Sequence, residues 1–266
     1  MEIVLRRKST FDHSVVARVW ENIEEHVTRE EAAAAVEAAA CETRQVIADL
    51  GVDRPVLGWS GGKDSQALRV VADHAGVPYA SMIGIVRAVE WPAMLDFIDR
   101  HAPPGCRVYS NDVITLSWLR DHPRYLFPHG QDGQFWTLRG TRQAQHRYQA
   151  DHAPDLWLFG RRRADNNWIA PTPYGIHTNQ AGMRQYSPIR DWPHELVLAV
   201  CKFYETPMAP VYAGPEGWLT GTGPWPGRRP KGDPWANTWA IDPDVVRAAA
   251  AVLPQAQAWM ETTGRT

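Results

Sequence analysis

The sequence predicts an α/β fold in which a parallel sheet is covered by helices on both faces. Three observations lead to this prediction. Short apolar runs alternate with helix-like segments through the middle of the chain, which is the order found in parallel-sheet proteins. Hydrophobic residues make up 44% of the 266 residues, which is enough for a sizeable core. The first apolar run also leads into a glycine-containing loop and a helix, and such sheets bind ligands beyond the carboxyl ends of their strands.

A helical extension is predicted ahead of the sheet. Thr28 precedes an acidic first turn and so has the pattern of a helix cap. The alanine-rich run 31–50 carries apolar residues at helical spacing and ends at Gly51. We therefore expect residues 1–52 to form a helical extension that packs on the main domain, residues 53–240.

Four strands and four helices are expected within that domain. The expected strands are residues 55–59, 79–86, 107–109 and 156–159. The expected helices are residues 67–76, 91–100, 140–150 and 192–205. Since the carboxyl ends of parallel strands share one edge, the loops after the first and fourth strands are expected to lie together.

The last third of the chain has a different composition. Residues 207–236 are rich in proline, glycine and tryptophan and predict a long irregular segment, which in a compact domain is usually functional or mobile. Residues 242–262 predict an amphipathic helix that begins with Asp242 and Pro243. We treat residues 241–266 as a separate C-terminal helix.

Charge and hydropathy exclude several classes of function. The formal net charge is -2, so no overall basic field is available to hold a nucleic-acid backbone, although a local basic patch is compatible with this balance. No stretch approaches the ~18 apolar residues of a membrane span. Met1 to Lys8 carries charges without an apolar run behind it, which does not fit a signal peptide. We therefore expect a cytoplasmic protein without a membrane partner, with oligomerisation left open.

Three cysteines are present and they are far apart. Cys41, Cys106 and Cys201 form no CxxC pair, so the pattern does not fit a disulfide scaffold. Zinc and iron–sulfur sites usually need four nearby ligands. We therefore expect buried or idle thiols and no iron–sulfur cluster.

A candidate phosphate-binding loop lies between the first expected strand and its helix. Its residues are Ser60, Gly61, Gly62, Lys63, Asp64 and Ser65. The two glycines let the backbone approach an anion and adopt dihedrals closed to other residues. The N–H groups of the new helix point at the same place, the lysine adds a positive charge, and the serines add hydroxyl donors. The aspartate either caps the helix or contacts a magnesium ion.

The loop differs from the ordinary Walker A loop, GxxxxGK followed by Ser or Thr. Gly58 and Gly62 are one residue too close together, and Asp64 follows the lysine. The loop instead resembles the PP-loop of the adenine nucleotide alpha hydrolase superfamily, which includes ATP pyrophosphatases and phosphoadenosine phosphosulfate (PAPS) reductases. The resemblance implies a Rossmann-like, HUP-type domain that binds ATP or a related adenine nucleotide together with Mg²⁺.

A second segment resembles the PAPS reductase branch. Residues 160–166 follow an expected strand and look like that branch's G-x-R-x-x-D/E-S/T segment, with Asn166 where a hydroxyl residue is usual. The matching residues are Gly160, Arg162 and Asp165. Consecutive arginines here either clamp a sulfate or phosphate or form a solvated run. The aspartate either orients an arginine or helps to hold magnesium.

Two further segments extend the resemblance, and one feature breaks it. Residues 187–192 look like the branch's P-L/I-x-D-W segment, and residues 207–212 look like its following turn. The resemblance covers roughly residues 55–235. The reductases carry a catalytic cysteine near the C-terminus, whereas no cysteine lies beyond Cys201 in this chain. Reductase activity is therefore not carried over.

The resemblance implies an enzyme that cleaves ATP to AMP and pyrophosphate and so activates an unknown acceptor by adenylation. We assign candidate catalytic roles to Lys63, Arg162 and Asp165. Candidate nucleotide-binding residues are the six loop residues together with Gly160 and Arg162, and Asp64 is a candidate magnesium contact.

Two alternatives stay open, namely a protein closer to the sulfonucleotide reductases and a non-catalytic nucleotide-binding subunit of a nucleic-acid modification system. The expected partners are an adenine nucleotide and either a protein or a nucleic-acid substrate. The basic cluster at residues 228–231 either closes on a ligand or is a surface loop.

Overall fold

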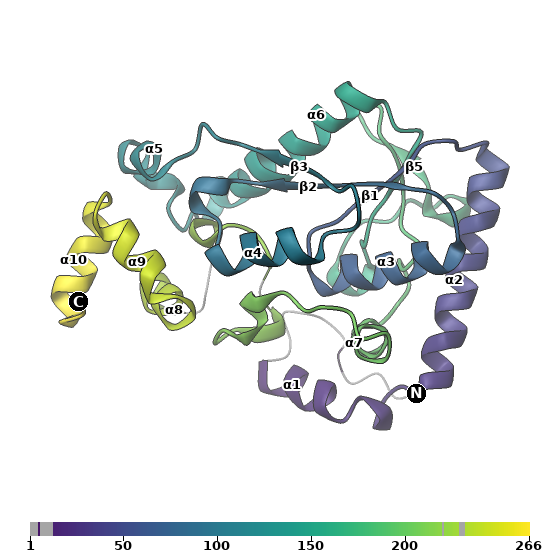
Figure 1. Cartoon of the computed structure of the whole chain (residues 1–266), viewed down its shortest axis with the longest axis horizontal. Helices are drawn as coiled ribbons and strands as arrows, with labels where there is room; N and C mark the ends of the chain where they lie inside the picture. Colours follow the sequence, from purple (N-terminus) through teal and green to yellow (C-terminus); the bar gives the residue numbers. More distant parts are fainter. Residues whose placement is uncertain (1–4, 6–12, 220, 229–231) are drawn as a thin grey trace.

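A six-stranded sheet forms the centre of the molecule (Figure 1). The computed structural model describes residues 5, 13–219, 221–228 and 232–266. The strands follow the spatial order β3-β2-β1-β4-β6-β5. Their bounds are β1 Pro55–Gly58, β2 Ala80–Ile85, β3 Arg107–Ser110, β4 Leu156–Leu158, β5 His177–Thr178 and β6 Arg184–Tyr186. All neighbouring pairs are parallel except β5 with β6, so the predicted α/β fold with a parallel, Rossmann-like sheet is confirmed.

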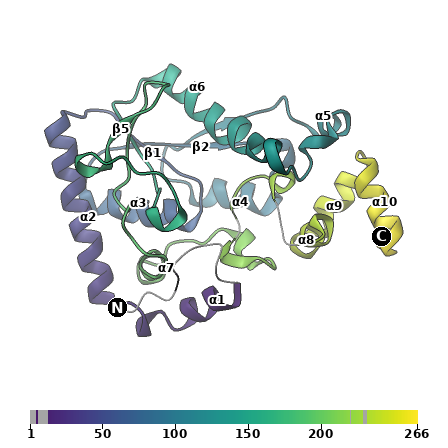
Figure 2. The same cartoon turned by 180° about the vertical axis from the view of Figure 1, so that it is seen from behind.

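Helices cover the sheet on both sides (Figures 1 and 2). Helices α3 and α4 lie on one side, and α6 packs against β2 and β3 on the other. Their bounds, with those of the two remaining helices of this region, are α3 Lys63–Ala75, α4 Pro92–His101, α5 Leu116–Asp121, α6 Gln143–His152 and α7 His194–Phe203. Gly84 allows the close approach of α6, because a Cβ there would lie 2.5 Å from that of Ala144.

The N-terminal extension consists of α1, His13–Glu21, and α2, Arg29–Leu50. Thr28 and Glu31 form a reciprocal capping box at the start of α2, and Gly51 ends the helix in the left-handed region with φ 58°. Helix α2 packs on α3 and α7. Apart from Leu5, the residues before His13 lie outside the described part of the chain.

Glu42 ties α2 to the far half of the sheet. Its carboxylate accepts hydrogen bonds from the Tyr186 hydroxyl at 2.6 Å and from the Arg190 guanidinium at 2.5 and 2.8 Å. Burial raises the pKa of Glu42, but hydrogen bonds from Arg190 and Tyr186 outweigh it, so the net pKa lies below the ordinary value. The carboxylate is therefore held ionised, and the helix is fixed to the strand β6.

The C-terminal region contains three helices where one was predicted. They are α8 Pro234–Ile241, α9 Pro243–Ala250 and α10 Pro254–Thr263. Pro254 breaks the expected helix 242–262, because it lacks an N–H and holds Leu253 in an extended conformation (φ -102°, ψ 114°). Helix α8 lies partly within the segment that was expected to be irregular. Figure 1 shows all three at one end of the molecule, away from α2.

Short turns join these elements. They are 3-10 turns at Ile23–Glu25, Arg87–Val89, Pro123–Tyr125, Gly130–Gln134, Arg163–Asp165, Pro173–Gly175, Pro210–Ala213, Gly217–Leu219 and Trp225–Gly227, and a π-helix at Thr137–Arg142. Within the described ranges, no helix combines the length and apolar character that crossing a bilayer requires.

Candidate nucleotide site

The predicted phosphate loop lies at the carboxyl end of β1, where it turns directly into α3. Gly61 has φ +70°, and a Cβ there would lie 2.9 Å from Cε1 of Phe97. Gly62 is the N-cap residue of α3, in extended conformation. A side chain at Gly61 is therefore disfavoured both by the positive φ and by the nearby Phe97 ring. Gly62 places the N-terminus of α3 at the loop.

The two serines hold the loop in shape. The Ser65 hydroxyl donates to the carbonyl oxygen of Gly62 at 2.9 Å and accepts from the Ser60 backbone N–H at 3.2 Å. The two hydroxyl oxygens are also 3.2 Å apart, and the Gly62 N–H contacts the Ser60 hydroxyl at 3.4 Å. These hydroxyls therefore brace the loop in this structure, and their expected role as donors to a phosphate stays a prediction.

Tyr212 reaches the loop from the distant turn Pro210–Ala213. Its hydroxyl accepts a hydrogen bond from the backbone N–H of Lys63 at 3.0 Å, at the first residue of α3. Gln66 fixes the start of the same segment by donating to the carbonyl oxygen of Pro207 at 2.6 Å. The sequence motif located this segment but gave Tyr212 no role. Its position shows that residues 207–212 form one wall of the loop.

A buried charge network surrounds the start of α3. The Lys63 ammonium lies 2.7 Å from Oδ2 of Asp64, and the Arg162 Nε lies 2.8 Å from Oδ1 of the same carboxylate. The Nη2 of Arg162 also contacts Oδ2 of Asp165 at 2.8 Å. The side chain of Arg162 is 0% exposed and that of Lys63 is 7% exposed. The structure therefore brings together the three predicted catalytic residues, since Asp64 joins Lys63 to Arg162 and Arg162 contacts Asp165.

His194, at the start of α7, completes this network. The Arg162 guanidinium donates to the carbonyl oxygen of Trp192 at 3.0 Å and contacts Nδ1 of His194 at 3.1 Å. Burial and, next, the neighbouring Arg162 lower the pKa of His194 to about 4, so its ring is neutral near pH 7. A single histidine in the sequence carried no signal for this role, because it follows the P-L/I-x-D-W-like segment without a motif of its own.

The three consecutive arginines do not converge on one point. Arg161 donates to Oε1 of Gln185 at 2.5 Å, Arg163 pairs with Asp191 at the surface, and Arg162 points into the charge network. Each Arg162 nitrogen thus has a protein partner, which suits a residue that positions Asp64. A direct contact of Arg162 with a phosphate stays a prediction.

Gly160 allows the segment after β4 to lie against the phosphate loop. A Cβ at this position would be 2.8 Å from the backbone carbonyl oxygen of Asp64. A larger residue would therefore push the first turn of α3 away from the strand. The match of Gly160 to the motif has a packing explanation, and its expected contact with nucleotide stays a prediction.

A partly enclosed cavity of about 110 Å³ adjoins the phosphate loop. Its lining includes Ser60 after β1, residues 83–86 at the end of β2, and Glu90. The π-helical segment and α6 close one side, and residues 222–224 close another. Drug-sized ligands fill pockets of about 300–1,000 Å³, so this cavity is too small for a whole nucleotide and has room for one planar ring system.

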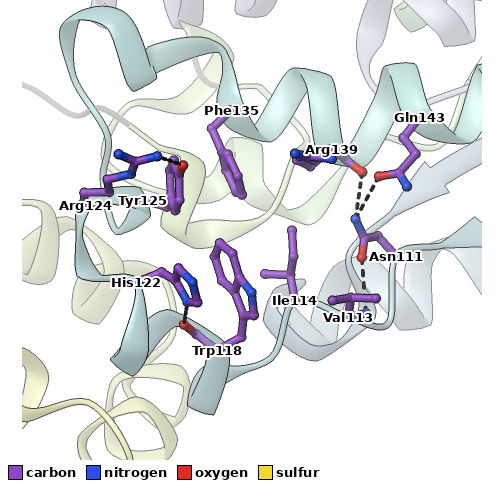
Figure 3. A pocket seen from close by; sticks show the side chains of 10 residues that line it. All are labelled: Asn111, Val113, Ile114, Trp118, His122, Arg124, Tyr125, Phe135, Arg139 and Gln143. Atoms are coloured by element: carbon purple, nitrogen blue, oxygen red, sulfur yellow. Dashed lines mark hydrogen bonds between the residues drawn. The ribbon is translucent and has the colours of Figure 1, made fainter.

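A second pocket of about 480 Å³ opens beyond the carboxyl end of β3 (Figure 3). Trp118, Tyr125 and Phe135 stack along it, with ring centroids 3.8 Å apart for Tyr125 and Phe135 and 5.7 Å apart for Trp118 and Phe135. The opposite wall contains Arg139 and Asn111, whose amide donates to the Arg139 carbonyl oxygen at 3.1 Å. Sequence analysis did not predict this aromatic pocket, because its rings come from separate segments without a spacing motif.

Comparison with known proteins identifies similarity in structure. No protein-family model matches the chain, and no curated protein matches it. The structure of phosphoadenylyl-sulfate (PAPS) reductase from Candida auris, in a phosphate complex, matches with a TM-score of 0.51 and 12% identity over 70% of this chain and 92% of that chain. The U34-tRNA thiolase NcsA from Methanococcus maripaludis, with its 4Fe–4S cluster, matches with a TM-score of 0.41 and 15% identity over 65% of each chain.

The expected cofactor set requires a correction. We expected ATP and Mg²⁺ and, from the three separated cysteines, no iron–sulfur cluster, whereas the thiolase structure contains such a cluster, so this expected set is not upheld. Both carboxylate oxygens of Asp64 accept from cationic side chains, which disfavours the expected magnesium contact. Among the described residues, no group of three or more His, Cys, Asp or Glu side chains is placed to hold a metal ion. The structure therefore assigns no cofactor.

The strand order, the loop at the end of β1 and the reductase similarity agree with one another. At this level of sequence identity the similarity concerns the fold and not the substrate. The chain therefore has a PAPS reductase-like PP-loop fold.

Proposed function

We propose that this chain binds the phosphates of ATP at residues 60–65 and cleaves the bond between the α and β phosphates. An acceptor oxygen would attack the α-phosphorus, the bond from that phosphorus to the bridging oxygen would break, and pyrophosphate would leave with the electron pair. The acceptor would carry the AMP group. The observation that supports this proposal best is the loop itself, because it joins a glycine-permitted turn, a helix N-terminus and a buried lysine at one place.

Lys63 is suited to stabilise charge that accumulates on the leaving pyrophosphate. Its ammonium group has three N–H donors, of which one contacts Asp64. Because the side chain is buried and held by Asp64, the positive charge needs little reorganisation when the substrate arrives. Preorganised charge in a site that excludes water usually makes the largest single contribution to catalysis.

ATP binding and turnover test this proposal. We expect titration calorimetry to show ATP binding and chromatography to show AMP and pyrophosphate as products, with water as a slow acceptor. Lys63→Ala should weaken ATP binding by about 1.5–3 kcal/mol, the contribution of a hydrogen bond to a charged group. The matched control is Arg120→Ala, which removes an exposed cation that pairs with Asp121.

Two outcomes would contradict separate parts of the proposal. A folded protein that binds no ATP, or a Lys63→Ala variant of unchanged affinity, would remove the phosphate-loop assignment. ATP binding without any AMP formation would leave a nucleotide-binding protein, which is the non-catalytic alternative. Circular dichroism and thermal unfolding of each variant would establish that the fold is intact.

The position of the cysteines disfavours the sulfonucleotide reductase alternative. Cys201 is completely buried in α7 and its thiol donates to the carbonyl oxygen of Lys63 at 3.4 Å. Burial raises the pKa of Cys201 to about 12, and burial also raises the pKa of Cys106. Because the thiolate is the nucleophile, neither group is suited to attack sulfur. We expect no sulfite from PAPS and thioredoxin, and sulfite release that disappears in Cys201→Ser would contradict this expectation.

A further inference from the structure

Glu90 is a buried acid on the wall of the cavity that adjoins the phosphate loop. It follows the 3-10 turn Arg87–Val89 and precedes Trp91, the N-cap residue of α4. The residue is 7% exposed, and its carboxyl oxygen Oε1 accepts one long hydrogen bond, 3.3 Å, from the N–H of Trp91. A carboxyl group in this position lacks the ion pair that usually accompanies burial.

The surroundings of Glu90 favour its neutral form. It is the one ionisable side chain among the described residues that line the cavity. Charged groups occur on the adjoining elements, and none forms an ion pair with Glu90 in the described part of the chain. They include Arg87 on its own turn, Lys63 and Asp64 on α3, Asp96, Asp99 and Arg100 on α4, and Arg139 and Arg142 on the π-helix. Arg228 lies beyond the turn Trp225–Gly227, with its guanidinium 5.4 Å from the Trp91 ring centroid. Burial raises the pKa of Glu90 to about 8, opposed only by the Trp91 N–H.

The phosphate loop and this acid share the cavity. Ser60 and Glu90 both line it, together with residues 83–86. A nucleotide whose phosphates lie on the loop would place its base in this space. This inference therefore rests on the proposed function.

We propose that Glu90, as a neutral carboxylic acid, reads the edge of the nucleotide base and selects adenine over guanine. A protonated carboxyl group offers one O–H donor and one carbonyl acceptor. Adenine offers the complementary pair, a ring-nitrogen acceptor beside its amino group, which is the pair that the amide of Gln or Asn reads. On the corresponding edge guanine presents two acceptors, of which the carboxyl group satisfies one.

Ionisation of Glu90 would remove this preference. A carboxylate has acceptors alone, so the hydrogen bond to the adenine ring nitrogen would be lost and two acceptors would face each other. Adenine affinity should therefore fall above pH 8, whereas a glutamine at this position keeps the donor and acceptor at every pH. The pair of variants Glu90→Gln and Glu90→Ala separates hydrogen bonding from charge.

The test measures the affinity of the full chain for four probes between pH 6.5 and 9. Binding of ATP and GTP reports on the whole site. Adenosine reports on the base position alone, and inorganic tripolyphosphate reports on the phosphate loop alone. The unchanged protein should prefer ATP to GTP at least tenfold at pH 6.5 and lose ATP affinity by up to about tenfold per pH unit above the pKa of Glu90. Tripolyphosphate serves as the reference for pH effects on the phosphates.

Glu90→Gln should retain the preference for ATP and remove the additional pH dependence. Glu90→Ala should bind ATP and GTP with similar affinity and still bind tripolyphosphate as the unchanged protein does. If Glu90→Ala does not fold, the Glu90→Gln variant and the pH profile still test whether Glu90 reads the base.

Separate outcomes identify separate failures. Unchanged ATP and adenosine affinities in Glu90→Ala, or identical pH profiles in Glu90→Gln and the unchanged protein, would overturn the role of Glu90 while tripolyphosphate binding upholds the phosphate loop. Adenosine binding that depends on Glu90, without any tripolyphosphate binding, would overturn the proposed function and support the base site.

Discussion

The phosphate loop and the aromatic pocket occupy the same edge of the sheet but are built differently. Around the loop, Lys63 and Arg162 are buried and each contacts a carboxylate at 2.7–2.8 Å. Around the aromatic pocket, the lining side chains other than buried Ile114 are partly or largely exposed, and Val113 is 75% exposed. The first region has its charges fixed before any ligand arrives, whereas the second presents rings to solvent. Substitutions at the loop should therefore reduce stability, and substitutions at the aromatic pocket should change it little.

The largest difference in stability between the two regions should come from a dependence on pH. Buried Glu90 imposes this dependence, and it lines the cavity beside the phosphate loop. Its pKa is about 8 in the folded chain, against an ordinary value of 4.5. Between these values the folded state binds one more proton than the unfolded state, so this residue lowers the free energy of unfolding as pH rises from about 4.5 to 8. Glu90→Gln removes the effect and should gain up to about 5 kcal/mol relative to the unchanged protein across this window, at about 1.4 kcal/mol per pKa unit.

Urea unfolding at pH 5, 6.5 and 8 measures this difference. Glu24→Gln removes a carboxylate from an exposed position and controls for net charge. A constant difference between Glu90→Gln and the unchanged protein at all three pH values would show that Glu90 titrates like a solvated acid.

A large loss of stability is also expected when Asp64 is removed from the charge network. Asp64→Ala leaves the buried guanidinium of Arg162 and the ammonium of Lys63 without their shared carboxylate. Removing one partner of a buried pair usually costs about 3–5 kcal/mol, and we expect about 3 because Asp64 is partly exposed. Chemical denaturation at pH 7 is the measurement. Asp121→Ala breaks an exposed pair with Arg120 and should have no measurable effect; equal losses in both variants would contradict the distinction.

Gly61→Ala should have a smaller effect that reports the shape of the loop. The substitution meets both a positive φ and the Phe97 ring at 2.9 Å, whereas Gly105→Ala meets a positive φ of 72° with no atom within 4 Å. We expect a loss of about 1–3 kcal/mol at Gly61 and a smaller loss at Gly105. The difference between the two unfolding free energies isolates the contact with Phe97. Equal losses would show that the loop has room for a methyl group.

The sequence predicted the regions whose residues are consecutive. A strand, a short turn and a helix follow one another at 55–75, and the last three residues of the motif already belong to α3, so local chemistry was enough to place Lys63 and Asp64 at a helix N-terminus. The parallel sheet was predictable from the alternation of apolar runs. The short strands β5 and β6 were missed, because segments of two and three residues show no periodicity.

The missing parts of the site depend on contacts between distant segments. Tyr212 lies 149 positions from its partner Lys63, and Arg162 lies 98 positions from Asp64. The sequence placed Arg162 at the correct edge, but its burial and its pairing with Asp64 depend on how the segment after β4 packs on α3. Glu90 was missed for a different reason. A lone glutamate normally indicates a surface position, and only the packed cavity shows that it is buried.

The smallest effect is expected in the aromatic pocket. Trp118→Ala removes one ring from a partly exposed stack with Phe135, and we expect ATP affinity within about twofold of the unchanged protein because no part of the Trp118 side chain lines the partly enclosed cavity. The boundary between the two regions is narrow, since Phe135 lines the aromatic pocket and Trp136, the next residue, lines the cavity. Trp136→Ala is therefore the matched variant and should weaken ATP binding, because it enlarges the space that is proposed to hold the base. Calorimetry on both variants measures the two effects. A loss of ATP affinity in Trp118→Ala as large as that in Trp136→Ala would show that the segment between the two pockets transmits changes from one to the other, and the two regions would then form a single binding site.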